Sequence, residues 1–303
     1  MVYLSICIPT YNRKSYLQKT IDSIVSQPFF QSGEVEIIVS DNASVDGTEE
    51  MMRLYTASAP NIRYFRNETN EGVSINIYKA LNLGTGLYRK VSNDTYIFKD
   101  GSLGRMVECI KKNELDRPFI LFSNEIASCD KNDTVCIDNL DQLVKNVSYN
   151  LTNDTVLGFW ESELSFIQNV NAWFWTIRAI FKIINIKSKL VIYNFELYSV
   201  ALVKNKDLTY GLIPVFYTEY LKCYEPYIGK EIKLRTYRQE KGRLLYGFFL
   251  LWLFVKETSN NYRFSSDDNV QNLRKAYGSP LILFSILLKL KVLKKKIRSL
   301  LHR

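Results

Sequence analysis

The sequence predicts an α/β fold in which a mostly parallel sheet is flanked by helices, followed by a helical C-terminal extension. In the first 125 residues, short apolar runs alternate with segments of helical periodicity. Strands that alternate with helices in this way form βαβ units and parallel sheets. From Leu244 the chain is apolar and aromatic, then polar, then amphipathic. We therefore expect three parts, 1–125, 126–243 and 244–303, with the first two forming one domain.

Each element of the first part is predicted from its own pattern. Runs rich in Val and Ile are too short for helices and fit buried strands, whereas apolar residues spaced by three or four indicate helices. Strands are expected over Tyr3–Pro9, Val35–Ser40, Ile62–Arg66, Leu87–Ser92 and Pro118–Asn124. Helices are expected over Ser15–Ser26, Asp46–Ala57, Gly72–Leu83 and Gly101–Lys112, and further along over Val191–Val203.

Composition and charge exclude several classes of protein. Hydrophobic residues make up 47% of the 303 residues and charged residues 23%, which excludes wholesale disorder. The net charge is +9, but 279–303 contains seven basic residues and no acid, so the rest of the chain carries only +2. A protein that binds nucleic acid through a basic body is therefore not expected.

The counts of histidine and cysteine restrict the chemistry further. The single histidine is His302, so the body of the protein has no Ser-His-Asp triad, no Cys-His dyad and no histidine-built metal site. Acid and base roles must fall to carboxylates, Tyr, Lys or Cys. The five cysteines form no CxxC pair, which favours a reducing compartment. The first residues lack the pattern of a signal peptide, and we expect a cytoplasmic protein.

Polar residues follow each predicted strand of the first part. In parallel sheets, ligands bind beyond the carboxyl ends of the strands, so these residues are candidates for one site. An arginine where a helix begins favours phosphate, and a carboxylate at a strand end can accept hydrogen bonds from a nucleobase or ribose or help to hold a divalent cation. Each segment alone also fits an ordinary helix cap or turn. The candidates are Pro9, Thr10, Tyr11, Arg13, Asp41, Asn42, Asn70, Gly72, Asn76, Asn93 and Asp94.

Three of these segments together resemble the nucleotide-binding half of the family 2 glycosyltransferases, which have the GT-A fold. They are LSICIPTYNR at the start, VEIIVSDNASVDGT at 35–48 and NEGVSINI at 70–77. The sequence is most similar to bacterial O-antigen and capsule sugar transferases of the abequosyltransferase-like kind. The resemblance implies a nucleoside-diphosphate sugar as donor, with 1–125 as the donor-binding half and 126–243 as the acceptor-binding, catalytic half.

The resemblance also implies roles for single residues. Thr10, Tyr11 and Arg13 would line the nucleotide pocket, and Asp41 would contact the base. Asn70, Gly72 and Asn76 would line the side of the ribose and diphosphate. Asp94 falls on the metal-binding Asp-x-Asp motif of the family and would hold Mg²⁺ or Mn²⁺. The sequence departs from the motif here, because Asn93-Asp94-Thr95 contains one carboxylate.

The family mostly inverts the anomeric centre, which requires a base for the acceptor hydroxyl. The candidates are Glu161, Glu163, Glu196 and Glu219. We prefer Glu196, because it lies among apolar and aromatic residues where burial can raise a carboxyl pKa. An exposed position on a helix is the alternative for this residue.

The tail indicates contact with a membrane surface. Leucines and isoleucines recur at helical spacing from Leu283 to Leu300 with lysines between them, which is typical of a basic amphipathic helix on an anionic membrane. A terminal helix packed on the body is the alternative. We expect a peripheral protein at the inner face of a bacterial membrane, acting on a lipid-linked glycan. A non-catalytic, membrane-associated nucleotide-sugar-binding protein is the second hypothesis. A dinucleotide oxidoreductase ranks last, because no GxGxxG follows a strand.

Overall fold

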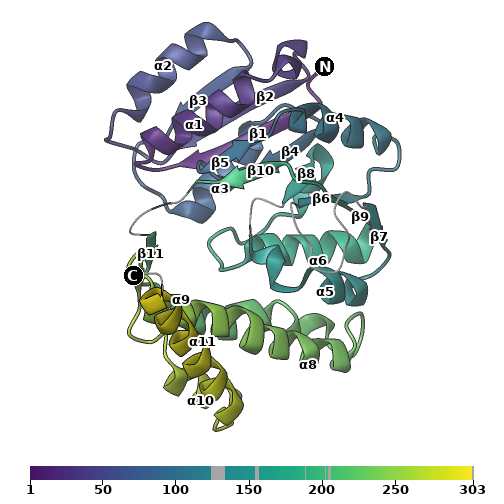
Figure 1. Cartoon of the computed structure of the whole chain (residues 1–303). Helices are drawn as coiled ribbons and strands as arrows, with labels where there is room; N and C mark the ends of the chain where they lie inside the picture. Colours follow the sequence, from purple (N-terminus) through teal and green to yellow (C-terminus); the bar gives the residue numbers. More distant parts are fainter. Residues whose placement is uncertain (124–133, 154–156, 188, 202, 204–205, 302–303) are drawn as a thin grey trace. The chain divides into compact units, whose positions relative to one another are not determined.

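The computed structural model describes residues 1–303 apart from 124–133, 154–156, 188, 202, 204–205 and 302–303, and for 206 and 296–301 the backbone only (Figure 1). The described chain falls into two compact units, Met1–Leu202 and Val203–Arg303. Each unit is considered by itself. The second of the three parts expected from the sequence, 126–243, spans the division between them.

The main sheet of the first unit has the strand order β3-β2-β1-β4-β8. Neighbouring strands from β3 to β4 are parallel, and β8 is antiparallel to β4. All seven positions of β2 are buried, as expected for a parallel strand with both faces covered. The strands are β1 Leu4–Thr10, β2 Val35–Asp41, β3 Ile62–Arg66, β4 Tyr88–Val91 and β8 Gly158–Trp160.

Helices cover both faces of this sheet, as the βαβ pattern predicts. Helix α3 packs against β1, β2 and β4, whereas α1 packs against α2 and the short strand β5 (Figure 1). The helices of the first unit are α1 Lys14–Val25, α2 Thr48–Ser58, α3 Val73–Leu83, α4 Ser102–Lys112, α5 Leu140–Val147 and α6 Trp175–Lys187. Short 3₁₀ segments span Pro28–Ser32, Ser148–Thr152 and Glu161–Phe166.

A second, smaller sheet has the order β6-β9-β7, with β6 parallel and β7 antiparallel to β9. Its strands are β6 Phe119–Ser123, β7 Thr134–Ile137 and β9 Leu190–Asn194. The helix predicted over Val191–Val203 is wrong: this segment forms most of β9 and then β10 Tyr198–Val200, which pairs with β5 Tyr96–Phe98. Leu190–Asn194 is fully buried and rich in β-branched and aromatic residues, so packing in a sheet determines its conformation.

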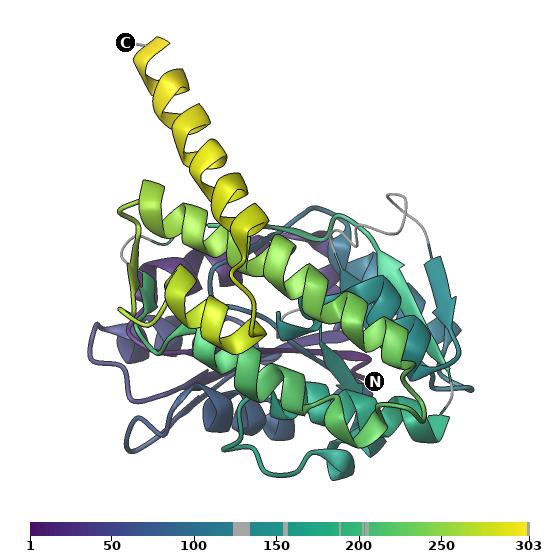
Figure 2. The same ribbon diagram turned by 90° about the horizontal axis from the view of Figure 1, so that it is seen from below.

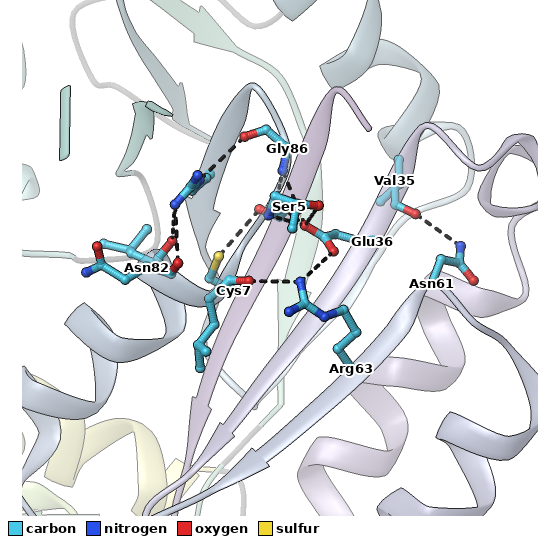
Figure 3. A network of polar contacts seen from close by, with 12 residues as sticks. Ser5, Cys7, Val35, Glu36, Asn61, Arg63, Asn82 and Gly86 are labelled. Atoms are coloured by element: carbon cyan, nitrogen blue, oxygen red, sulfur yellow. Dashed lines mark hydrogen bonds and ion pairs between the residues drawn. The ribbon is translucent and has the colours of Figure 1, made fainter. Parts of the chain in front are cut away.

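A buried polar network fixes the amino-terminal end of the main sheet (Figure 3). Glu36 accepts hydrogen bonds from the Ser5 hydroxyl at 2.6 Å, from the Thr85 amide at 2.5 Å and from the Gly86 amide at 3.2 Å. The Arg63 guanidinium adds an ion pair at 3.4 Å. A Cβ atom on Gly86 would lie 2.8 Å from the Ser5 backbone nitrogen, so this close approach requires glycine.

The described part of the second unit is helical and contains a short pair of parallel strands. Strand β11 Lys206–Leu208 pairs with β12 Tyr262–Phe264. The helices are α7 Leu212–Val215, α8 Leu234–Arg243, α9 Leu250–Thr258, α10 Val270–Tyr277 and α11 Ile282–Leu301, with π-helical turns at Phe216–Tyr220 and Leu244–Phe249 and a 3₁₀ turn at Glu225–Tyr227. The segment from α8 through the second π-turn to α9 is one continuous helical run, and α11 packs on α9 and extends beyond it (Figure 2).

Candidate functional site

One cavity of about 380 Å³ lies at the carboxyl ends of β1, β2 and β4, where it is closed on one side by α3. This volume falls within the range of small-molecule sites. Four segments that are distant in sequence meet there, as the strand-end argument predicts. The lining residues are Pro9, Thr10, Tyr11, Arg13, Asn42, Asn70, Gly72, Val73, Asn76, Ile77, Val91, Ser92, Asn93 and Asp94. Apart from Asp41, every candidate for this pocket named from the sequence lines it.

Asp94 is the buried acid of this cavity, with 2% of its surface exposed. Its Oδ2 accepts a hydrogen bond from the Thr10 hydroxyl at 2.8 Å, and its Oδ1 accepts one from Arg13 Nη1 at 3.0 Å. Burial raises the pKa of Asp94, and the neighbouring Arg13 and Thr10 oppose that rise only in part. The carboxylate, the hydroxyl and the guanidinium thus act as one unit that joins the ends of β1 and β4.

Amide side chains form the opposite wall. Asn42 Nδ2 donates to Asn70 Oδ1 at 2.6 Å, and Asn42 Oδ1 accepts from the Asn67 side chain at 3.1 Å. Asn76 Nδ2 donates to the Ser40 carbonyl at 2.9 Å, while its Oδ1 accepts from the Ser40 hydroxyl at 2.7 Å. These bonds hold the loop before α3 against the end of β2, so contacts within the protein position the wall.

The amino-terminal end of α3 also opens on the cavity. Gly72 precedes the helix with φ of +88°, a conformation that favours glycine. The first turn of α3 contains no acidic residue, and Gly72 and Val73 line the cavity. Backbone N–H groups at a helix start attract anions, so this end of the cavity suits a negatively charged ligand.

Asp41 lies beside the cavity but is fully buried. Its Oδ1 accepts hydrogen bonds from the Ser44 amide at 2.9 Å and the Ser44 hydroxyl at 2.5 Å, and its Oδ2 accepts one from the Tyr64 hydroxyl at 2.6 Å. This bonding raises the Tyr64 pKa, with burial as the larger cause. The carboxylate therefore orders the loop after β2, and its contact with a base stays a prediction.

The four glutamates considered as the catalytic base all have basic partners. Glu196 pairs with Lys99, Glu161 with Arg117 at 3.2 Å, Glu163 with Lys187 and Glu219 with Lys222 at 2.7 Å. The burial expected for Glu196 is wrong, because 61% of its side chain is exposed. It lies in the irregular segment between β9 and β10 rather than in a helix. Of these four glutamates, Glu163 is the buried one, and burial raises its pKa to about 7.

The side chains of the cavity do not fit a divalent cation held by the protein. Within the described parts of the chain, no group of three or more His, Cys, Asp and Glu residues is placed to hold a metal ion. Asp94 is the one carboxylate that lines the cavity, and both of its oxygens already accept bonds from Thr10 and Arg13. Mg²⁺ and Mn²⁺ need several oxygen ligands at once, so with one carboxylate from the protein the others would have to come from water and from the phosphates of a ligand.

The C-terminal helix α11 has two different faces. Phe284 and Leu288 are buried, in keeping with the packing of this helix on α9. The side chains of Leu283, Ile286, Leu290 and Leu293 are about half exposed, and they follow one another at the spacing of a single helix face. Exposed lysines lie beside this face at Lys289, Lys291 and Lys294, whereas Lys295 donates to the Thr258 carbonyl at 2.8 Å on the side packed on α9. Among the described residues, no helix is long and apolar enough to cross a membrane.

The structure adds residues that the sequence did not indicate. Val73, Ile77, Val91 and Ser92 line the cavity, although nothing in their type marks them. Asn67 and Tyr64 support the walls from β3 and the loop after it. Asn67 lies in the polar run after β3, which was a usable signal, whereas the contact of Tyr64 with Asp41 depends on the pairing of β2 with β3.

Comparisons of sequence agree with this geometry. Residues 5–119 match the family model described as glycosyl transferase family 2, which confirms the resemblance for that segment. Abequosyltransferase RfbV of Salmonella typhimurium is 38% identical over 136 residues, covering 44% of this chain and 37% of the relative. A GalNAc(5)-diNAcBac-PP-undecaprenol beta-1,3-glucosyltransferase of Campylobacter jejuni is 32% identical over 115 residues, covering 38% and 36%. The matches therefore span little more than a third of the length of these relatives.

Comparisons of structure extend over most of the chain. S. aureus TarS 1-349 in complex with UDP-GlcNAc superposes with a TM-score of 0.59 at 14% identity, covering 84% of this chain and 77% of that one. Mannosyltransferase PcManGT from Pyrobaculum calidifontis, in complex with GDP-Man and Mn²⁺, gives a TM-score of 0.56 at 13% identity, covering 97% and 87%. At these identities the likeness shows the fold, and the predicted GT-A fold is confirmed.

Proposed function

We propose that this chain is a glycosyltransferase that moves a sugar from a nucleoside-diphosphate sugar to a hydroxyl of a lipid-linked glycan during synthesis of a bacterial surface polysaccharide. The observation that carries the proposal is that the segments after β1, β2 and β4 and before α3 line one cavity. The same segments carry the match to glycosyl transferase family 2. The relatives of Salmonella typhimurium and Campylobacter jejuni, by their names, transfer sugars, which supports the reaction type.

In this proposal the donor lies along the cavity with its nucleoside between Tyr11 and Asn42. Its ribose and diphosphate lie toward Asn76 and the start of α3, where backbone N–H groups and Arg13 attract negative charge. Asn42 and Asn70 of the amide wall are held by a hydrogen bond to each other. The donor is therefore bound at a small entropic cost, and its anomeric carbon is held in one place.

We propose inversion at that carbon, with Glu196 as the base that takes the proton of the acceptor hydroxyl. The expected burial is no longer the reason for this choice. Of the four glutamates, Glu196 has the most exposed side chain, so an acceptor can reach it. Four separate Glu→Gln variants test the choice: Glu196→Gln should lose transfer, and Glu161→Gln, Glu163→Gln and Glu219→Gln should keep it. Normal transfer by Glu196→Gln would exclude Glu196.

No step of this proposal passes through Mg²⁺ or Mn²⁺. The cation implied by the family resemblance stays a prediction, because among the described lining residues Asp94 is the one carboxylate, and it is bonded to Thr10 and Arg13. What the residues of this chain do is bind the diphosphate, orient it and stabilise the charge that develops when it leaves.

We also propose that α11 binds the inner face of the cell membrane, where a lipid-linked acceptor is found. Its half-exposed apolar face and flanking lysines suit an anionic lipid surface. Sedimentation with vesicles containing phosphatidylglycerol tests this: a chain that ends at residue 278 should stay in the supernatant at moderate salt, and the full chain should sediment. A chain in which Leu283, Ile286, Leu290 and Leu293 are changed to Ser separates the apolar contribution from the charge. Equal sedimentation of all three would contradict the proposal.

The reaction itself is tested by incubating the full chain with a panel of nucleoside-diphosphate sugars and measuring released nucleoside diphosphate. Wild type should release it from one donor, and Asp94→Ala should reduce the rate by at least about a hundredfold, because the groups at the diphosphate lose their positions. Lys19→Gln, an exposed change on α1, is the control and should keep the wild-type rate. Binding of a donor with no turnover by wild type would favour the second hypothesis, a non-catalytic nucleotide-sugar-binding protein.

A further inference from the structure

The charges that line the cavity are paired with each other. Of the lining residues, Asp94 is the one with an acidic side chain and Arg13 the one with a basic side chain. They form an ion pair at 3.0 Å, and the Thr10 hydroxyl bonds to the other carboxylate oxygen at 2.8 Å. Asp94 therefore already has a cationic partner, and that partner belongs to the protein.

This arrangement opposes a divalent cation on Asp94. A cation bound to the Asp94 oxygens would lie next to the Arg13 guanidinium, and two positive groups at that separation repel each other strongly where water is scarce. To make room, the ion pair between Arg13 and Asp94 would have to break. The Arg13 side chain would then lose the carboxylate that orients it.

Arg13 is suited to bind a diphosphate directly. One of its guanidinium nitrogens bonds to Asp94, and about a third of the side chain is exposed at the cavity. A guanidinium has five N–H donors in a planar fork that matches phosphate oxygens, so it can bind a carboxylate on one edge and a phosphate on another. Asp94 and Thr10 fix the first edge, which sets the direction of the second.

We propose that Arg13, oriented by Asp94 and Thr10, takes the place of a metal ion at the donor diphosphate, so that this chain binds nucleoside diphosphates without a divalent cation. The inference rests on the proposed function, since it requires a nucleoside diphosphate in this cavity. Asp94 is then a positioning residue that acts through Arg13.

Isothermal titration calorimetry of the full chain with UDP, GDP, CDP, ADP and dTDP tests the inference, each titrated once in EDTA and once in Mn²⁺. The diphosphate that binds should have the same Kd in both, within about twofold. Arg13→Gln should weaken it about tenfold to a hundredfold, the contribution of a hydrogen bond between charged groups. The corresponding nucleoside, which has no phosphate, should bind wild type and Arg13→Gln equally. Lys19→Gln removes the same charge from α1 outside the cavity and should bind as wild type does.

Asp94→Asn distinguishes the two roles of the carboxylate. If Asp94 orients Arg13, this variant should weaken diphosphate binding by a smaller factor than Arg13→Gln, and by the same factor in EDTA and in Mn²⁺. If Asp94 holds a metal ion, the loss should appear in Mn²⁺ alone. Thermal melting of each variant establishes that it is folded before titration, and Arg13→Lys provides a second folded variant that keeps the charge but loses the fork.

The outcomes separate the inference from the proposed function. Binding that requires Mn²⁺, or binding in EDTA that Arg13→Gln leaves unchanged, would overturn the inference while the proposed function stands. If none of the nucleoside diphosphates binds in either condition, the proposed function fails, and the inference fails with it. Equal Kd values in both conditions, with a loss in Arg13→Gln, a smaller loss in Asp94→Asn and none in Lys19→Gln, would support both.

Discussion

Two buried carboxylates occupy opposite ends of the same parallel sheet, and their surroundings differ. Glu36, near the start of β2, is 3% exposed and accepts bonds from Ser5, Thr85 and Gly86 (Figure 3). Asp94, after the end of β4, is 2% exposed and lines the cavity. Burial alone would raise both pKa values. At Glu36 the hydrogen bonds outweigh burial and lower the pKa, whereas at Asp94 burial prevails and the pKa is raised.

The difference shows that burial does not by itself mark a functional acid. Glu36 is satisfied by groups of the fold, including the backbone of the turn before β4, so its charge stabilises the protein. Asp94 accepts hydrogen bonds from Thr10 and Arg13, which also line the cavity, so its carboxylate positions side chains of the site. The sheet is thus fixed at its amino-terminal end and carries the site at its carboxyl end.

The largest expected effect is on Glu36. Glu36→Gln puts an amide group among donors that all require an acceptor, so the free energy of unfolding of the first unit should fall by about 3 kcal/mol. Urea denaturation followed by circular dichroism measures the change. Glu34→Gln removes a more exposed charge that pairs with Lys111 and should cost less than about 1 kcal/mol. Equal losses in the two variants would show that the Glu36 network in Figure 3 contributes no more to stability than the ion pair of Glu34 with Lys111.

Replacing the carboxylate at the other end of the sheet by an amide, in Asp94→Asn, should have a small effect on the free energy of unfolding. Burial raises the pKa of Asp94 and so disfavours its charge, and Asp94→Asn removes that penalty together with the bonds to Thr10 and Arg13. The two terms oppose each other, and the free energy of unfolding should change by less than about 1 kcal/mol. A loss as large as that of Glu36→Gln would mean that Asp94 is part of the framework rather than of the site.

The smallest effect is a difference in pH dependence, and the two residues should differ in sign. The folded pKa of Glu36 is lowered, so its stabilisation is present above the ordinary value of 4.5 and is lost as pH falls below it. The gap between wild type and Glu36→Gln should therefore shrink on acidification. The folded pKa of Asp94 is raised, so its penalty disappears as pH falls toward 3.8, and wild type should gain relative to Asp94→Asn. If the free energies of unfolding of wild type and variant changed in parallel with pH, both for Glu36→Gln and for Asp94→Asn, the two opposite pKa shifts would be refuted.

Much of the site was predictable because it depends on local order along the chain. Strand, polar turn and helix follow one another three times before residue 83, and parallel pairing then brings the turns to one edge. What failed depends on contacts between distant segments. The β-strand at Leu190–Asn194 forms because β6 and β7 flank it. Glu196 is exposed in the irregular segment between β9 and β10. The position of Asp41 beside the cavity likewise depends on β3, which places Tyr64 against it.

The most direct measurement is the position of a bound nucleotide. Crystals of the full chain soaked with the nucleoside diphosphate that binds best should show difference density in the cavity, with phosphate oxygens within hydrogen-bond distance of Arg13 and of the first N–H groups of α3, and with Asp94 still paired to Arg13. Density that lies outside the cavity lined by Thr10, Asn76 and Asp94 would contradict the account.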